Sequence, residues 1–468
     1  LRLIGPTTSI NGVFLGPFWY YFNLPPFIAT GGNPVAPLLW QIVWYQLAGL
    51  LVYLFVKKTD QNLAFFTAVF FLLMPLGFNT SRYFWNANAM PIFTALYLLC
   101  LLLARQKSSP LRASLLGLAA GLALQIEAAF GIIFFPFSFL FLLFATRKIK
   151  VHLAHLFAFL ATLLPQALFE VRHQFSMTKV FLSEVGGKNS LLGERMTFGE
   201  RFSDRWETIR NLTTQISHIH PNFLFSVFAL LLVLGLYFLI KKTGPKSTRE
   251  FFVINLAFLV FAFVFYLLFP KEIKSWYLLG LAVPLVFLYS SSLSLLFSIG
   301  KPVIKLGVIL LFFASLYSTY VAQTDYLKVA DIMSSNNKSS LKNEKRVIDW
   351  VYQHAGGQGF KAYSYLPSIY DYPYQYLYWW YGPKAYGYQP NEVAYLPNQP
   401  EYIDNMTSFI TITKPLSTDE PVFLIIEKDT EIPDRQYAWR GNFAHLCVRE
   451  KETFSFGVEV ESLSTCSK

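Results

Sequence analysis

Eight ionisable residues stand out because they lie at the ends of long apolar runs, in four separate segments of the chain. They are Arg82, Glu127, Glu170, Arg172, His173, Lys271, Glu272 and Lys274. Placing an ionisable side chain at or within a membrane span costs free energy, so each of these residues is a candidate functional residue. Arginine and lysine can neutralise a phosphate, and a carboxylate can accept the proton of an attacking hydroxyl group. The set therefore indicates a site for a phosphate ester at a membrane surface.

Each of these cations alone has a simpler explanation, because lysine and arginine at helix ends commonly anchor a helix to lipid headgroups.

The sequence contains no glycine-rich nucleotide loop, no HExxH zinc motif, no paired CxxC motif and no GxSxG nucleophile turn. These absences argue against soluble nucleotide chemistry, zinc-dependent hydrolysis and serine hydrolysis. We therefore expect no metal and no cofactor.

Long apolar runs dominate the first 320 residues of the chain. Of all residues, 54% are hydrophobic and only 14% are charged, whereas a soluble domain carries about 25% charged residues. A helix needs about 20 apolar residues to cross a bilayer, and the buried helices of a large soluble protein would instead be amphipathic. We expect about ten spans, at residues 37–56, 62–78, 89–104, 113–129, 130–146, 151–169, 222–240, 251–269, 276–297 and 303–320.

Lysine and arginine are distributed unevenly between the loops. Alternate loops on one side hold 14 of them, and the short loops on the other side hold only Arg82, Lys271 and Lys274. Because these residues are retained on the cytoplasmic side, the difference predicts the orientation of a multi-pass protein of the cytoplasmic membrane. It also accounts for the net charge of +11 without a nucleic-acid partner. The eight ionisable residues, the 170–221 loop and the C-terminus are then expected on the outer face.

The chain divides into three expected regions. Residues 1–36 contain Pro25 and Pro26 among many aromatic residues, which favours an outer-face juxtamembrane segment over a spanning helix. Residues 37–320 form a polytopic bundle of membrane helices. Residues 321–468 have the charge density of a soluble domain, which we expect to be extracytoplasmic. The predicted fold class is mainly α, with a small α/β domain at the C-terminus.

The C-terminal region shows both helix and strand patterns. Residues 343–355 have the apolar spacing of an amphipathic helix. Strand patterns occur at residues 360–366, 422–427 and 454–461. Cys447 and Cys466 could pair, although two cysteines do not make a disulfide framework.

A dense aromatic string lies within residues 370–388, where ten of nineteen residues are aromatic. Such a string suits a belt at the membrane interface or simple core packing. It equally suits a surface on which a sugar or acceptor stacks. In that case Tyr376, Trp379, Trp380 and Tyr381 are the candidates for stacking.

Five segments carry a resemblance to a known family. They are GVFLGPFWYYFNLPP at 12–26, SRYFWNAN at 81–88, GLAAGLALQIEAAFG at 117–131, FEVRH at 169–173 and YDYPYQYLYWWYG at 370–382. Together they resemble the glycosyltransferase C superfamily, of the family 39-like kind that includes protein mannosyltransferases and lipid A aminoarabinose transferase. The first segment is similar to a family segment that follows the first outer loop. The last two segments are similar to the corresponding segments of a bacterial subgroup of this superfamily. The resemblance covers roughly residues 1–320, and none of its motifs is as specific as a metal signature.

The resemblance implies an inverting transfer of one sugar from polyprenyl phosphate, with an Asp or Glu of the first outer loop as catalytic base. Residues 1–59 contain no Asp or Glu, and the first acid is Asp60 on the predicted cytoplasmic side. The family's first helix and most of its first outer loop would precede Leu1. We therefore expect the base upstream of Leu1, within roughly 50–90 further residues that include one more span. Glu127 and Glu170 are the next candidates.

The interpretation is a membrane glycosyltransferase whose partners are a polyprenyl-phosphate-linked sugar, membrane lipid, and an acceptor glycan, lipid or protein. The lipid phosphate would be held by Arg82, Arg172, His173, Lys271 and Lys274. Two alternatives remain open. A transporter or flippase of a lipid-linked glycan is disfavoured by the large outer domain and the absence of acids at mid-span. A non-catalytic membrane scaffold would need no base.

Overall fold

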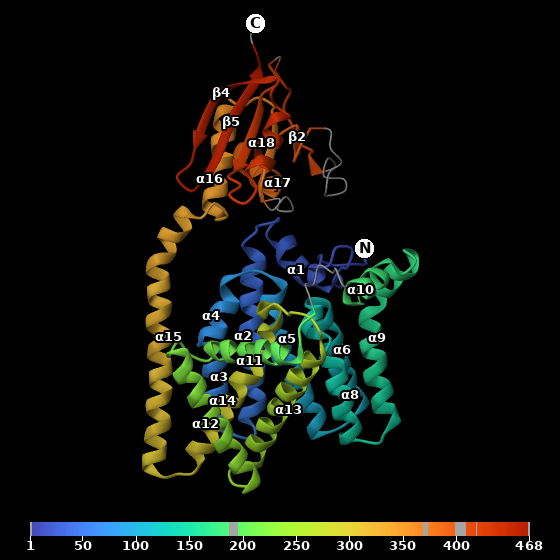
Figure 1. Ribbon diagram of the computed structural model, residues 1–468, viewed down its shortest axis with the longest axis vertical. Coiled ribbons are helices and arrows are strands. Elements are labelled where there is room, and N and C mark those ends of the chain that lie inside the picture. Colours follow the sequence, from blue (N-terminus) through green and yellow to red (C-terminus); the bar gives the residue numbers. More distant parts are fainter. Residues whose placement is uncertain (1, 187–194, 368–372, 398–408, 418, 467–468) are drawn as a thin grey trace. The chain divides into compact units, whose positions relative to one another are not determined.

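The computed structural model describes residues 2–186, 195–367, 373–397, 409–417 and 419–466 (Figure 1). Two compact units divide the chain, Leu1–Gln323 and Thr324–Lys468. The described part of the first unit is built of helices, and the second unit combines helices with one five-stranded sheet. The predicted fold class is confirmed.

The first unit contains the membrane-spanning helices. Its elements are α1 (Phe18–Ala29), α2 (Ala36–Lys57), α3 (Gln61–Leu72), α4 (Pro75–Arg82), α5 (Asn86–Gln106), α6 (Pro110–Ile126), α7 (Ala128–Gly131), α8 (Phe134–Ala145), α9 (Ile149–Arg172), α10 (Ser176–Gly186), α11 (Phe198–Leu212), η1 (Thr213–Gln215), α12 (Pro221–Ile240), α13 (Lys246–Leu268), η2 (Ser275–Leu281), α14 (Ala282–Ser298) and most of α15 (Pro302–Asn336). Within the described ranges, nine helical stretches are long and apolar enough to cross a membrane, and α6 is a tenth, shorter one. In the part of the chain that the structure describes, apolar helices are thus found at the ten predicted positions, and nine of them are long enough to be spans.

Three of the spans differ from their predicted bounds. The predicted fourth span ended at residue 129, but α6 ends at Ile126 and the next residue caps α7. The second span is interrupted after Leu72, because Pro75 lacks the amide hydrogen that would continue α3 and instead starts α4. The last predicted span ended at residue 320, but α15 continues without a break to Asn336. Helix α1, with Pro25 and Pro26 inside it, has only 12 residues and is shorter than a span.

Helix α6 approaches α9 closely because two of its glycines face that helix. A methyl group on Gly117 would collide with the backbone carbonyl of His155, and one on Gly121 would collide with the side chain of Thr162. Small residues four positions apart allow two membrane helices to pack backbone against backbone. Only 11% of the α9 span is buried, so α6 supplies most of its attachment to the bundle.

Contacts between loops assign them to the two ends of the first unit. At one end, the hydroxyl group of Thr248 donates to Asp60, and Arg105 pairs with Glu250 at 3.4 Å. These contacts bring the basic loops after α2 and α5 to the start of α13. At the other end, which we call the site end, Asn79 of α4 contacts Gln215 of η1, and the loop after α13 contacts Arg205 of α11. For the loop after α2, the end of α5 and the start of α13, these contacts agree with the predicted alternation, and the side of the membrane on which each end lies stays a prediction.

The second unit is a sheet with helices on both faces. Its elements are α16 (Leu341–His354), β1 (Lys361–Tyr365), α17 (Pro373–Tyr386), β2 (Glu392–Ala394), β3 (Val422–Glu427), α18 (Pro433–Gly441), β4 (Leu446–Thr453) and β5 (Val458–Thr465). The strand order is β2-β1-β3-β5-β4, with β1 parallel to β2 and β3, and β5 antiparallel to its neighbours. One face packs on α16 and α17 and the other on α18, because alternate residues of each strand point to opposite faces.

The predicted elements of this unit are largely confirmed, with one correction at its end. The pattern at residues 454–461 read as a single strand, but Phe454 and Gly457 form the turn between β4 and β5. Gly457 has a φ of +84°, a left-handed conformation that glycine adopts without strain. Cys447 and Cys466 form a disulfide across these two strands. Residues 370–372 of the aromatic string lie outside the described residues, and most of the remainder forms α17.

Asp429 holds the loop between β3 and α18. Its carboxylate accepts hydrogen bonds from the Tyr365 hydroxyl at 2.6 Å, the Ile432 amide at 2.8 Å and the Arg435 guanidinium at 2.7 Å. Asp429 is only 2% exposed. The Tyr365 hydroxyl, the Ile432 amide and the charge of Arg435 hold the pKa of Asp429 well below its usual range.

Candidate functional site

Glu127 lies at the turn between α6 and α7 and is buried. Its Oε1 atom accepts a hydrogen bond from the amide of Ala129 at 3.2 Å, which caps the start of α7. Its Oε2 atom accepts one from the side-chain amide of Asn86 at 3.1 Å. Asn86, the first residue of α5, also donates to the carbonyl of Ile126 at 2.8 Å. Two elements thus fix a carboxylate that is only 5% exposed.

Tyr266 connects this turn to the end of α13. Its hydroxyl group donates to the carbonyl of Ala129 at 2.9 Å, and the side chain is 3% exposed. Both Glu127 and Arg205 lie within electrostatic range of this hydroxyl. Tyr266 is therefore joined to the α6–α7 turn through its hydroxyl group and to Arg205 through its carbonyl group, which accepts a hydrogen bond from Nε at 3.3 Å.

Arg205 joins α11 to the loop after α13. Its Nη2 donates to the carbonyl of Lys271 at 2.6 Å, its Nε donates to the carbonyl of Tyr266 at 3.3 Å, and its Nη1 pairs with Asp204. One turn earlier, Arg201 donates to the carbonyl of Leu267 at 2.9 Å. The last carbonyls of a helix have no partner within the helix and carry partial negative charge, so two arginines at this end are stabilising.

Lys271 and Lys274 occupy very different positions in the loop after α13. Lys271 is fully buried, and its carbonyl is held by Arg205. Lys274 is about half exposed and pairs with Glu272 at 2.7 Å. A buried ammonium group is retained only where neighbouring groups offset the loss of its hydration. Of the two lysines, Lys271 therefore belongs to the interior of the site end.

A continuous series of hydrogen bonds runs through this region. It passes from Asn86 to Glu127, through Ala129 to Tyr266, and through Arg205 to Lys271. We call Asn86, Glu127, Tyr266, Arg205 and Lys271 the Glu127 cluster. It places a buried carboxylate, a buried guanidinium and a buried lysine in one hydrogen-bond network, in which the links to Tyr266 and Lys271 run through main-chain carbonyl groups.

Arg82 lies in the neighbouring loop of the site end, at the end of α4. Its Nη2 donates to the side chain of Asn79 at 2.6 Å, and its guanidinium stacks on Phe78. Asn79 in turn donates to Gln215 of η1 at 2.9 Å. Burial and, second, the charge of Arg82 lower the pKa of His218, which places these two side chains close together.

The turn between α9 and α10 carries the remaining predicted residues and is separate from the Glu127 cluster. Glu170 accepts hydrogen bonds from the amides of Met177 and Thr178, both at 3.0 Å, and so fixes the start of α10. Arg172 and His173 are exposed, and the ring of His173 stacks on Phe169. Figure 1 shows α9 and α10 at the edge of the bundle away from α4.

The predicted stacking residues of the second unit differ in exposure. Trp380 is 9% exposed and lies between the ammonium groups of Lys345 and Lys384, at 5.1 Å and 4.8 Å from its ring. Tyr381 also faces Lys345, at 4.8 Å. Trp379 is 37% exposed and packs against Tyr376 with ring centroids 5.4 Å apart. Of the four candidates, Trp379 is therefore the most accessible for stacking.

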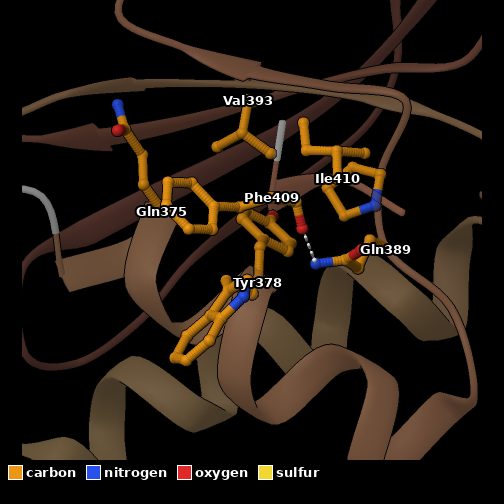
Figure 2. A pocket seen from close by; sticks show the side chains of 8 residues that line it. Gln375, Tyr378, Gln389, Val393, Phe409 and Ile410 are labelled. Atoms are coloured by element: carbon orange, nitrogen blue, oxygen red, sulfur yellow. Dashed lines mark hydrogen bonds between the residues drawn. The ribbon is translucent and has the colours of Figure 1, made fainter. Parts of the chain in front are cut away.

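Trp379 also lines a pocket of about 190 Å³, part of it open to solvent (Figure 2). The lining residues are Gln375, Tyr378, Trp379, Gln389, Pro390, Val393, Phe409 and Ile410. The Tyr378 hydroxyl is buried and has no hydrogen-bond partner among the residues that the structure describes. Gln389 is committed to the neighbouring backbone, where it donates to the carbonyl of Phe409 at 3.1 Å.

Three members of the Glu127 cluster were missed at the level of sequence. Asn86 and Tyr266 are uncharged, and Arg205 lies inside the long 170–221 loop rather than at the end of an apolar run. A signal for Arg205 was present. Arg201 and Arg205 are four residues apart, as are Phe202 and Trp206, which is the spacing of an amphipathic helix with both pairs on neighbouring faces.

Comparison with known proteins agrees with the resemblance. Residues 26–168 match the family model of dolichyl-phosphate-mannose-protein mannosyltransferases. Among solved structures, the crystal structure of ArnT from Cupriavidus metallidurans in the apo state is similar, with a TM-score of 0.56 and 14% sequence identity. The likeness covers 98% of this chain and 94% of that one. None of the curated proteins compared with the chain matches it. The resemblance predicted from the motifs is confirmed over residues 26–168, and the polytopic fold is confirmed over nearly the whole chain.

Proposed function

We propose that this membrane protein, with its mannosyltransferase family match and the fold of ArnT, is a glycosyltransferase that uses a polyprenyl-phosphate-linked sugar. Transfer would take place at the outer face of the cytoplasmic membrane. The strongest support is the position of Glu127, a buried acid within the matched segment that hydrogen bonds connect to the cationic loop after α13. A buried acid in the same hydrogen-bond network as a cationic loop suits transfer from a lipid phosphate.

The proposed chemistry has two parts. A carboxylate accepts the proton of the acceptor hydroxyl as that hydroxyl attacks the sugar, and Glu127 is our candidate for this part. Cations neutralise the phosphate that leaves with the polyprenyl chain, and Lys271 and Arg82 are our candidates for this part. Lys274 would contribute less, because it is exposed and already pairs with Glu272.

The α9–α10 turn has a secondary place in this proposal. Glu170 is a weaker candidate for the base than Glu127, because its carboxylate already accepts the amide hydrogen bonds that start α10. Arg172 and His173 would contact the donor phosphate or a lipid headgroup. Their exposure suits either contact.

The acceptor is a glycan, lipid or protein, and we assign its recognition in part to the second unit. Trp379 offers an accessible aromatic face at the edge of a pocket. Aromatic rings of this kind combine a large apolar surface with a polar atom, which suits contact with a sugar ring.

The test is sugar transfer by the protein in lipid nanodiscs, with a panel of radiolabelled polyprenyl-phosphate sugars and isolated cell envelopes as acceptor. We expect transfer from one or a few donors. Lys271→Ala and Arg82→Ala should each reduce the rate by about 10²-fold or more, the usual loss on removing a contact to developing charge. Lys274→Ala serves as the matched control and should reduce it by less than about tenfold, since exposed pairs contribute about 1 kcal/mol or less.

Two results would contradict this proposal. Transfer that is unaffected by both Lys271→Ala and Arg82→Ala would show that the two cations only anchor the protein to headgroups. Movement of the lipid-linked sugar across vesicles without transfer would instead favour a flippase.

A further inference from the structure

Helix α11 has three faces with different surroundings. One face is buried and carries Arg205, Thr208 and Leu212. A second face is apolar yet exposed: Phe198 is 61% exposed, Phe202 46% and Trp206 48%. The third face is polar and exposed, with residues Glu200, Ser203 and Asn211. Residues four positions apart share a face of an α-helix, so each set forms a stripe along the helix.

The apolar stripe does not suit contact with water. Leaving apolar surface in water costs about 25 cal/mol for each Å². A helix that lies in a membrane surface has the opposite requirement, because its apolar side enters the acyl-chain region and its polar side stays wet. Figure 1 shows α11 lying across the long helices rather than along them, as such a helix would.

The stripe is continuous with the lipid-facing surface of two spanning helices. Phe202 contacts Phe263 of α13, with ring centroids 5.6 Å apart, and Trp206 contacts Phe225 of α12 at the same distance. Exposed apolar side chains continue along both spans, including Phe223, Leu230, Val260, Val264 and Leu268. In a multi-pass membrane protein, such side chains face lipid.

We infer that α11 lies in the membrane surface at the site end, with Phe198, Phe202 and Trp206 in contact with lipid acyl chains. Its two neighbouring arginines then act as positioning residues. Arg201 and Arg205 attach the buried face of α11 to the last carbonyls of α13 and to the carbonyl of Lys271. Insertion of the stripe into lipid thereby holds the Lys271 loop in place. This inference does not depend on the reaction that the site performs.

Site-directed spin labelling tests the lipid contact. Cys100 is first replaced by serine, since Cys447 and Cys466 are joined in a disulfide. Nitroxide labels are then placed by Phe202→Cys and Ser203→Cys, on adjacent faces of the same helix, in nanodiscs of phosphatidylethanolamine and phosphatidylglycerol. We expect the label at 202 to collide mainly with oxygen, which concentrates in acyl chains. We expect the label at 203 to collide mainly with a water-soluble nickel chelate.

The same measurement separates the alternatives. Equal access of the nickel chelate to both labels would show that the stripe faces water and would overturn the inference. A label at 202 that neither reagent reaches would show that a protein surface or a second copy covers the stripe, and would also overturn it. A label at Leu230→Cys on α12 supplies the reference for full lipid exposure.

Hydrogen–deuterium exchange tests the connection between the stripe and the loop. Phe202→Asn should raise the exchange rate of the amides at 269–277 several-fold, because α11 would rise from the membrane and loosen the hold of Arg205. Ser203→Asn on the wet face should leave those amides unchanged. Unaltered exchange in Phe202→Asn, with the span of α13 still protected, would show that the loop is held independently of lipid.

Discussion

Arg205→Ala is expected to destabilise the site end more than any other removal of an arginine from α11. The substitution removes two charged hydrogen bonds, to the carbonyls of Tyr266 and Lys271, and leaves the carboxylate of Asp204 without its partner. Hydrogen bonds from a charged group contribute about 1.5–3 kcal/mol each. Arg205 is 2% exposed, so water replaces few of these bonds in the variant.

The expected loss in free energy of unfolding is therefore about 3–5 kcal/mol, from two hydrogen bonds of a buried guanidinium at about 1.5–3 kcal/mol each, and Asp204 adds little because it is 31% exposed. The gain from no longer burying a guanidinium is included in that range. Arg210→Ala on the same helix is the matched control. The side chain of Arg210 is 41% exposed and pairs at 2.6 Å with Glu207, which is 47% exposed, so its loss should cost about 1 kcal/mol or less.

The assay is equilibrium unfolding in mixed micelles of dodecyl maltoside and increasing sodium dodecyl sulfate, followed by far-ultraviolet circular dichroism. Arg205→Lys should recover less than half of the loss, because an ammonium group lacks the planar fork that reaches both carbonyls. If Arg205→Ala and Arg210→Ala unfold at the same detergent fraction, the hydrogen bonds of Arg205 contribute no net stability. The reasoning would then fail.

Three further predictions concern the acid, the second unit and its aromatic surface. Glu127→Gln keeps the size of the side chain and an acceptor for the Ala129 amide, but it cannot accept a proton and turns an NH2 group toward the donor Asn86, so sugar transfer should fall by about 10²–10⁴-fold, whereas Glu170→Gln should mainly loosen α10. Asp429→Asn should destabilise the second unit at pH 7, as shown by faster amide exchange in β1 and β3. Folding lowers the pKa of Asp429, so the ionised carboxylate stabilises the folded second unit above about pH 4, and this stabilisation is lost as the pH falls below that value. The difference in amide exchange between Asp429→Asn and the parent protein should therefore shrink in acid. Trp379→Ala should weaken acceptor use with little loss of stability, and Trp380→Ala, at a nearly buried position, should cost about 3–5 kcal/mol in the second unit.

The spanning helices were predictable because lipid imposes one simple requirement on them. A run of about 20 apolar residues has no other stable placement, so length and composition locate each span. The details that composition does not carry were harder to predict. The break before Pro75 follows from a local backbone rule, but the continuation of α15 to Asn336 depends on a segment that is no longer apolar.

The candidate site was predictable only where a charge stood out against an apolar background. Glu127 and Lys271 were found for that reason, and both are buried in the structure. Tyr266 escaped notice because tyrosine at the end of a span ordinarily anchors it at the interface. Its role follows from the distance between its hydroxyl group and Ala129, which is 137 residues away along the chain. Tertiary contacts of that kind leave no local pattern.

The aromatic string of the second unit shows the same limit. Its composition allowed a membrane belt, a core or a sugar surface, and α17 places part of it in the core and leaves another part exposed. Tyr374 and Tyr378 are buried beneath the sheet, whereas Trp379 reaches the surface. The position and rotation of α17 against the sheet determine which of these residues are buried and which are exposed.

The narrow contact between α9 and α6 affects the order in which the helices assemble during synthesis and the order in which they separate in detergent. A helix that touches its bundle mainly along one line is held by close packing and by a few hydrogen bonds, such as the one between Ser138 and His155 at 2.9 Å, because lipid surrounds its other sides as readily as protein does. Gly117 and Gly121 make that line possible, and their neighbours include backbone that cannot move aside. During synthesis α9 can enter the membrane independently and dock afterwards, and on solubilisation it should be the first span to separate. Harsh detergents would then remove α9 and α10 together while the Glu127 cluster, which rests on other helices, stays assembled.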